Sequence, residues 1–222
     1  MIEYVKFYNG FPYRLFSKRK FKFNNRLNVV IGPNGSGKTT LLHTLAAAAG
    51  CGNGGWSQTH ADTLPYKFVV KRDTMPVFYQ NCFTHSERSF IDESYLTEKK
   101  FLRSTGEKRI GLINQLIDCI EKRFLTYQLK SAQRPSIILD EADNHIGFAG
   151  QSILWNEIFP VLIKKYQLII ASHSIFPILL QKNTTLRSDN LISLYKNYDH
   201  TCVDVLIQAY KKYEGINSAN FN

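Results

Sequence analysis

The sequence lacks the features that mark membrane proteins, disulfide-rich secreted domains and zinc proteins. Its four cysteines (Cys51, Cys82, Cys119 and Cys202) are scattered without CxxC spacing, so they predict neither a zinc site nor a disulfide framework. No uncharged apolar stretch approaches the ~20 residues that a helix needs to cross a bilayer. The first residues carry charges where a signal peptide needs an apolar run. We therefore expect reduced thiols, no membrane segment and a cytoplasmic protein.

Internal repeats and heptad runs long enough for a coiled coil are also lacking. The 222 residues are enough for one α/β domain, and a content of 44% hydrophobic and 21% charged residues excludes wholesale disorder. Acidic residues are few: 18 Asp and Glu stand against 28 Lys and Arg, which gives a net charge of +10. This charge fits a polyanionic partner such as nucleic acid, and it also fits a set of solvated basic pairs.

Short β-branched or aromatic runs alternate with helical patterns along the chain. The segments predicted as strands are 3–8, 21–23, 27–31, 66–70, 77–79, 136–139, 168–171, 191–195 and 202–207. The segments predicted as helices are 38–49, 107–130, 151–165 and 175–181, and the tail from 215 to 222 is expected to be frayed. The early strands are crowded, whereas the later ones each follow a helix. This order predicts an antiparallel β section that leans on a mainly parallel α/β sheet.

A glycine-rich loop connects the predicted strand 27–31 to a Leu- and Ala-rich helix. The loop and the start of the helix consist of Gly32, Pro33, Asn34, Gly35, Ser36, Gly37, Lys38, Thr39 and Thr40. This is the pattern GxxxxGK[ST] in its strand–loop–helix context, where backbone N–H groups and a helix N-terminus point at an anion. We expect Lys38 to reach the β- and γ-phosphates of a nucleotide and the Thr39 hydroxyl to coordinate Mg²⁺.

Two acids follow the apolar run Ser136-Ile-Ile-Leu. A buried strand that ends in Asp140 and Glu141 places both carboxylates at the carboxyl edge of the sheet, beside the phosphate loop. Phosphoryl transfer needs a carboxylate for the metal and a group that orients the attacking water. We expect Asp140 to serve the metal and Glu141 to act as general base.

The phosphate loop in the form GPNGSGKTT, together with the Asp-Glu pair after the predicted strand 136–139, resembles the ABC ATPase superfamily. Within it, the chain resembles the SMC and RecF-like heads and the ATPase part of the overcoming-lysogeny-defect nucleases, over roughly residues 1–195. The resemblance implies a P-loop NTPase fold in one domain, residues 1–222, with a helical signature-motif subdomain at about 84–134. It also implies ATP and Mg²⁺ as ligands.

Three weaker motifs extend the resemblance. By this resemblance, His173, after Ile-Ile-Ala-Ser, would contact the γ-phosphate, and Gln80 would contact Mg²⁺ and the attacking water. Ser104 and Gly106, in a divergent signature motif, would bind the γ-phosphate held by an opposite subunit. Each has a simpler interpretation: a structural histidine, a polar residue that ends a strand, and a plain helix cap.

The resemblance implies a head-to-tail homodimer around two ATP·Mg²⁺, in a family that works mostly on DNA in repair, maintenance and anti-phage defence. Only 66 positions separate Lys38 from Ser104, too few for the long coiled coil of an SMC head. With no room for a nuclease domain either, we expect a separate partner or effector protein. DNA, if bound, would be held through its phosphates. Two rivals remain: a regulatory ATP-binding module that controls a nuclease or toxin with little turnover, and an ABC transporter ATPase subunit.

Overall fold

The structure is a computed structural model that describes residues 1–51, 64–80, 118, 121, 134–144, 146–180 and 190–219. Most of the predicted helix 107–130, and with it the predicted signature-motif subdomain, lies outside these residues. Asp118 and Glu121, which the structure does describe, are helical. Among the helices in the described part of the chain, none combines the length and the apolar character that a membrane crossing requires.

Five parallel strands form the central sheet in the order β5-β6-β7-β3-β8. Their bounds are β3 Leu27–Ile31, β5 Val77–Gln80, β6 Ser136–Asp140, β7 Gln167–Ser172 and β8 Asn190–Ser193. Every residue of the three middle strands β6, β7 and β3 is buried, as expected for parallel strands covered on both faces. All five carboxyl ends therefore meet at one edge, which confirms the predicted parallel α/β sheet.

Three antiparallel strands form a second sheet in the order β2-β1-β4. β1 (Ile2–Phe7) lies between β2 (Lys20–Lys22) and β4 (Phe68–Arg72), which confirms the predicted antiparallel section. The buried Gln167 joins the two sheets, since its side chain accepts from the Ile2 N–H and donates to the Ile2 carbonyl, both at 2.7 Å.

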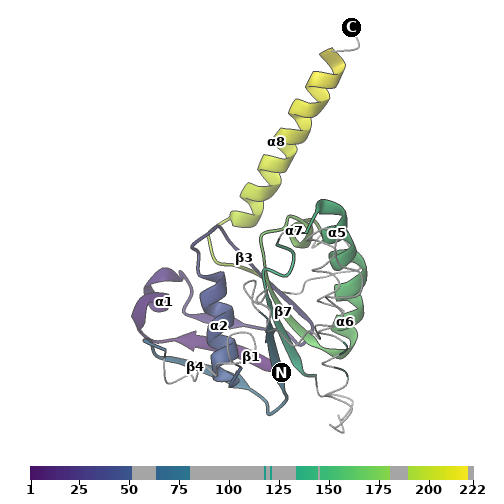
Figure 1. The fold of residues 1–222 in the computed structure, drawn as a ribbon. Helices are drawn as coiled ribbons and strands as arrows, with labels where there is room; N and C mark the ends of the chain where they lie inside the picture. The colour runs from purple at the N-terminus through teal and green to yellow at the C-terminus, as the bar shows by residue number, and fades with distance from the viewer. Residues whose placement is uncertain are drawn as a thin grey trace, which may run out of the picture.

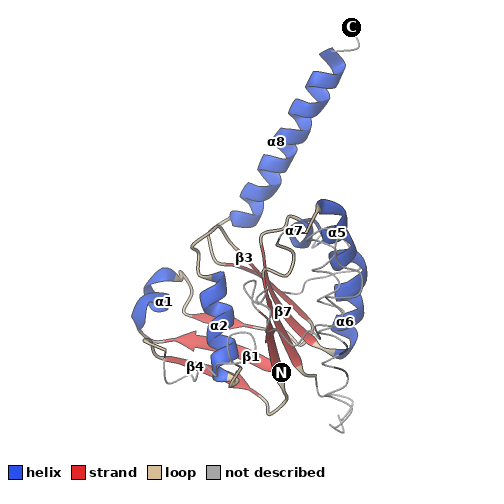
Figure 2. Ribbon diagram, in the orientation of Figure 1, coloured by secondary structure: helices blue, strands red, loops and turns tan. Residues whose placement is uncertain are grey.

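Helices cover both faces of the parallel sheet (Figure 1, Figure 2). On one face, α2 (Lys38–Ala48) shares a core with the inner side of the antiparallel sheet. The opposite face packs against one continuous helical layer, made of α5 (Phe148–Ile153), the π-helical turn η2 (Leu154–Ile158) and α6 (Phe159–Lys165). Two further short helices are α1 (Gly10–Leu15) and α7 (Phe176–Leu180).

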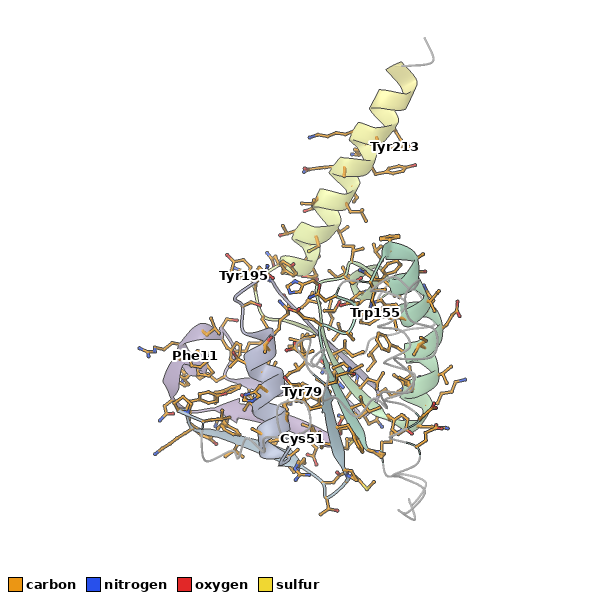
Figure 3. The ribbon with its side chains drawn as sticks, in the orientation of Figure 1. Phe11, Cys51, Tyr79, Trp155, Tyr195 and Tyr213 are labelled. Carbon is orange, nitrogen blue, oxygen red and sulfur yellow. The ribbon has the colours of Figure 1, made fainter. Side chains whose placement is uncertain are left out.

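The structure corrects the prediction at the C-terminal end. Residues 202–207, predicted as a strand, belong to the helix α8 (Tyr198–Ala219), and residues 215–219, expected to be frayed, are helical too. The run of β-branched residues near 205 has the alternation of a strand only over a few residues. Over a longer window, Cys202, Leu206 and Tyr210 recur every fourth residue, which is the helical period. α8 extends away from the rest of the described chain (Figure 1), and Figure 3 shows Tyr213 projecting from it.

Candidate nucleotide site

The glycine-rich loop runs from the end of β3 to the start of α2 and is fixed by two left-handed glycines. Gly35 has φ +76° and Gly37, the N-cap of α2, has φ +93°. A Cβ on Gly37 would lie 2.6 Å from Leu15 Cδ2, whereas a Cβ on Gly35 would meet nothing within 4 Å. Gly37 is therefore required by conformation and by packing, and Gly35 by conformation alone.

Lys38 is buried beneath the loop. Its ammonium group donates to the carbonyl oxygens of Gly32 at 2.9 Å and Pro33 at 3.2 Å. Burial lowers the pKa of Lys38, and the nearby carboxylates of Glu141 and Asp140 oppose this change. The positive charge is thus held between the phosphate loop and the two acids that the sequence predicted beside it.

Asp140 ends β6 with only 2% of its surface exposed. Neither carboxylate oxygen makes a hydrogen bond of normal geometry with a described residue. Burial raises the pKa of Asp140 to about 6; Glu141 adds to the rise, while the Thr39 side chain and Lys38 oppose it. A buried carboxylate without full hydrogen bonding is costly unless a cation accompanies it. Asp140, with the Thr39 hydroxyl nearby, therefore fits a site for Mg²⁺, an ion that prefers oxygen ligands.

Glu141 and His173 lie together, although 32 positions separate them in the sequence. Their side chains are 3.2 Å apart, between Glu141 Oε1 and His173 Nε2. The Asn144 side-chain amide donates to Glu141 Oε2 at 2.9 Å, and the Glu141 backbone N–H donates to the carbonyl of Ala171 in β7. Glu141, the predicted general base, and His173, the predicted γ-phosphate contact, are therefore neighbours at the sheet edge.

A buried hydrogen-bond network lies next to Glu141 and His173 in the chain, and the sequence did not predict it. The Ser172 hydroxyl and, at 3.2 Å, the Trp155 indole N–H donate to the Asp143 carboxylate. Burial raises the pKa of Asp143, while these two hydrogen bonds oppose the rise. Figure 3 shows Trp155 in the helical layer that covers the sheet. Asp143 and Ser172 stand next to predicted site residues, which is a usable signal, but nothing local in the sequence marks Trp155.

Gln80, the third predicted catalytic residue, ends β5. β5 pairs with β6, with Gln80 opposite Leu139, so its backbone lies one strand from Asp140 at the same edge. The predicted Ser104 and Gly106 lie outside the described residues.

The AAA domain family (AAA_23) matches residues 9–217. The chain belongs to this family. No curated protein matches the chain. Among solved structures, C. elegans PCH-2 is similar at 17% identity with a TM-score of 0.36, over 78% of this chain and 36% of that one, a likeness too low to carry an argument. This chain thus spans about a third of that relative's length.

The AAA domain of residues 9–217 is a P-loop ATPase domain of α/β architecture. Its family membership and its phosphate loop together indicate nucleotide binding, which in such domains is typically accompanied by Mg²⁺.

Proposed function

We propose that this AAA domain is an ATP-hydrolysing switch of the SMC/RecF-like branch, which dimerises head-to-tail around two ATP·Mg²⁺. The observation that carries the proposal is the Glu141–His173 contact at the sheet edge that also holds Lys38 and Asp140. A pure nucleotide-binding fold needs the cradle, but it has no need of a carboxylate and an imidazole beside it.

Each side chain has a distinct task in this proposal. Water attacks the γ-phosphorus, a bond forms from the water oxygen, and the bond to the bridging oxygen of ADP breaks. Glu141 accepts the proton of the attacking water, and His173 contacts the γ-phosphate and registers its departure. The backbone of the loop and Lys38 bind the phosphates.

Thr39 and Asp140 are the residues that would hold Mg²⁺, with Gln80 as a third candidate ligand. The bound ion supplies charge neutralisation to the phosphate oxygens. The chain's own contribution is to keep a buried carboxylate at the end of β6, two strands along the sheet from β3, which leads to the phosphate loop.

The proposed dimer supplies the switch. In it, Ser104 and Gly106 of one protomer contact the γ-phosphate held by the other, so ATP joins the two protomers and hydrolysis releases them. The work of the switch, in DNA repair, DNA maintenance or anti-phage defence, is passed to a separate partner protein.

One observation favours a second candidate, a regulatory ATP-binding module with little turnover. Both carboxylate oxygens of Glu141 already carry a partner, Asn144 on Oε2 and His173 on Oε1. Each oxygen can still accept a water, but the two partners hold the carboxylate in one position, and a base that turns less freely toward the attacking water would slow turnover without weakening ATP binding. Steady-state phosphate release, with and without DNA, separates a slow module from a DNA-stimulated ATPase.

The test of the main proposal compares Glu141→Gln with Lys38→Ala in Mg²⁺ and ATP. We expect Glu141→Gln to lower turnover by roughly 10²-fold or more and to accumulate as an ATP-bound dimer in light scattering. Lys38→Ala should stay monomeric because it loses phosphate binding. Glu157→Gln, an exposed glutamate in the helical layer, is the matched control and should behave as wild type. A Glu141→Gln protein that binds ATP and remains monomeric would contradict the sandwich.

A further inference from the structure

The outer side of the antiparallel sheet carries a dense set of lysines and tyrosines. In the strand register, Lys20 lies opposite Lys6, and both Lys22 and Lys71 lie opposite Tyr4. Residues directly opposite one another on antiparallel strands share one face of the sheet. We name this surface the basic face; its members are Tyr4, Lys6, Tyr8, Lys20, Lys22 and Lys71.

Two lysines of the basic face lie over tyrosine rings. The Lys20 ammonium is 3.9 Å from the centroid of Tyr4, and the Lys6 ammonium is 4.8 Å from the centroid of Tyr8. Lys71 forms an ion pair with Glu3 at 2.8 Å. In the described part of the chain, no carboxylate lies within ion-pair distance of Lys6, Lys20 or Lys22. The face therefore keeps most of its positive charge.

Folding accounts for only part of this arrangement. Like charges directly opposite one another destabilise a sheet, and Lys6 and Lys20 form such a pair. Lysines on edge strands protect a sheet from unwanted pairing, which accounts for those of β2 and β4. β1 is the central strand of the three, so the same reason does not apply to Lys6. The cation–π contacts of Lys6 and Lys20 offset part of this cost, but they do not require several lysines to gather on one face, and such a concentration of positive charge points to a binding role.

The basic face is separate from the nucleotide site. The buried residues of β1 and β2, among them Val5, Phe7 and Phe21, point to the opposite side of the sheet and share a core with α2, against which Phe68 and Val70 of β4 are packed. Figure 1 shows α2 beside this sheet, with the phosphate-loop end of β3 beyond it. None of the lysines and tyrosines of the basic face belongs to the nucleotide site, so binding to each surface can be measured with a separate probe.

We infer that the basic face binds the phosphodiester backbone of DNA, with its lysines on phosphates and its tyrosines against sugars or bases. The choice of DNA among polyanions rests on the proposed function; the surface itself does not. Lysine–phosphate contacts release counterions, so binding is strongest at low salt. Tyrosine rings favour the exposed bases of a single strand over a duplex, because every base has a face that can stack.

The experiment uses fluorescence anisotropy with labelled single-stranded and duplex oligonucleotides, over a range of salt concentrations. The test variant carries Lys6→Gln, Lys20→Gln and Lys22→Gln. The control carries Lys164→Gln, Lys211→Gln and Lys212→Gln, which remove the same charge from exposed positions in α6 and α8. We expect the test variant to bind at least about tenfold more weakly and to lower the salt slope by roughly 2–3, and the control to bind as wild type.

Two further measurements identify which phosphate-bearing partner the face binds and separate a failure of this inference from a failure of the proposed function. Tyr4→Leu should weaken single-stranded DNA more than duplex DNA; equal losses would assign the face to duplex backbone. A control triple variant that loses as much as the test variant would overturn the inference, as would binding of the face to anionic phospholipid vesicles but not to either oligonucleotide. Each protein is also titrated with a fluorescent ATP analogue. Loss of DNA binding with ATP binding intact concerns the basic face, whereas a wild-type protein without ATP binding contradicts the proposed function.

Discussion

Replacement of Asp140 by asparagine should stabilise this protein while removing its function. The pKa of Asp140 rises from 3.8, an ordinary value for aspartate, to about 6, mainly because the carboxylate is buried. Each pKa unit corresponds to about 1.4 kcal/mol. The ionised carboxylate therefore costs the folded state about 3 kcal/mol at pH 7, a large fraction of the ~5–15 kcal/mol by which domains are stable. An amide has the size and polarity of the protonated acid and avoids this cost.

The sign of the pH dependence follows from the direction of the shift. Because the pKa of Asp140 is higher in the folded than in the unfolded state, the folded state binds more protons between about pH 4 and 6. The cost of the carboxylate is therefore complete above the folded pKa, and it is lost as the pH falls toward the unfolded value. The advantage of Asp140→Asn should be about 3 kcal/mol at pH 7 and about half of that at pH 5.

The measurement is urea unfolding of wild type and variant at pH 7 and pH 5, in EDTA and without nucleotide. Glu141→Gln is the matched control: its side chain is 20% exposed and hydrogen-bonded, so its stability should stay within about 1 kcal/mol of wild type. Addition of Mg²⁺ and ATP should stabilise wild type and leave Asp140→Asn nearly unchanged. An Asp140→Asn protein that is no more stable at pH 7, or whose advantage does not shrink at pH 5, would refute the argument.

Two further predictions concern residues that fix the backbone around the site. Gly37→Ala should cost about 1–2 kcal/mol for the left-handed backbone and a further ~1–3 for its clash, whereas Gly35→Ala pays only the first cost. Unfolding and ATP titration of the two variants should show this difference, and equal stabilities would contradict it. Gln167→Ala should destabilise by about 2–5 kcal/mol, because the buried N–H and carbonyl of Ile2 lose their partners; a change below 1 kcal/mol in denaturant unfolding would show that other groups replace them.

The sequence predicted the strands and the loop around the candidate site well because their signals are local. The strand 27–31 coincides with β3, and the acids after 136–139 end β6, since buried parallel strands read as unbroken apolar runs. The glycines of the loop occupy the conformations that the pattern requires. α1 has no comparable signal, because it is a short helix that contains Pro12.

Features that depend on register could not be read from the sequence. Lys6, Lys20 and Lys71 are far apart along the chain, and only the pairing of β1 with its two neighbours brings them to one face. Trp155 reaches Asp143 from another layer of the fold, which no spacing in the sequence encodes. A prediction of strand order and register would have placed the lysines on one face. The contact between Trp155 and Asp143 follows only from the packing of the helical layer on the sheet.

The conformations of the two acids after β6 favour a functional role over a structural one for this edge of the sheet. Asp140 is buried with a raised pKa, and Glu141, the next residue, has φ +51°, a left-handed conformation that costs a non-glycine residue about 1–3 kcal/mol. The register of β6 and β7 sets Asp140 opposite Ala171, so the chain turns at Glu141 where His173 leaves β7, and the strained backbone aims the carboxylate at the imidazole. Two consecutive residues thus lower the stability of the fold, and neither contributes to the core. Such costs persist where a ligand or a reaction requires the geometry.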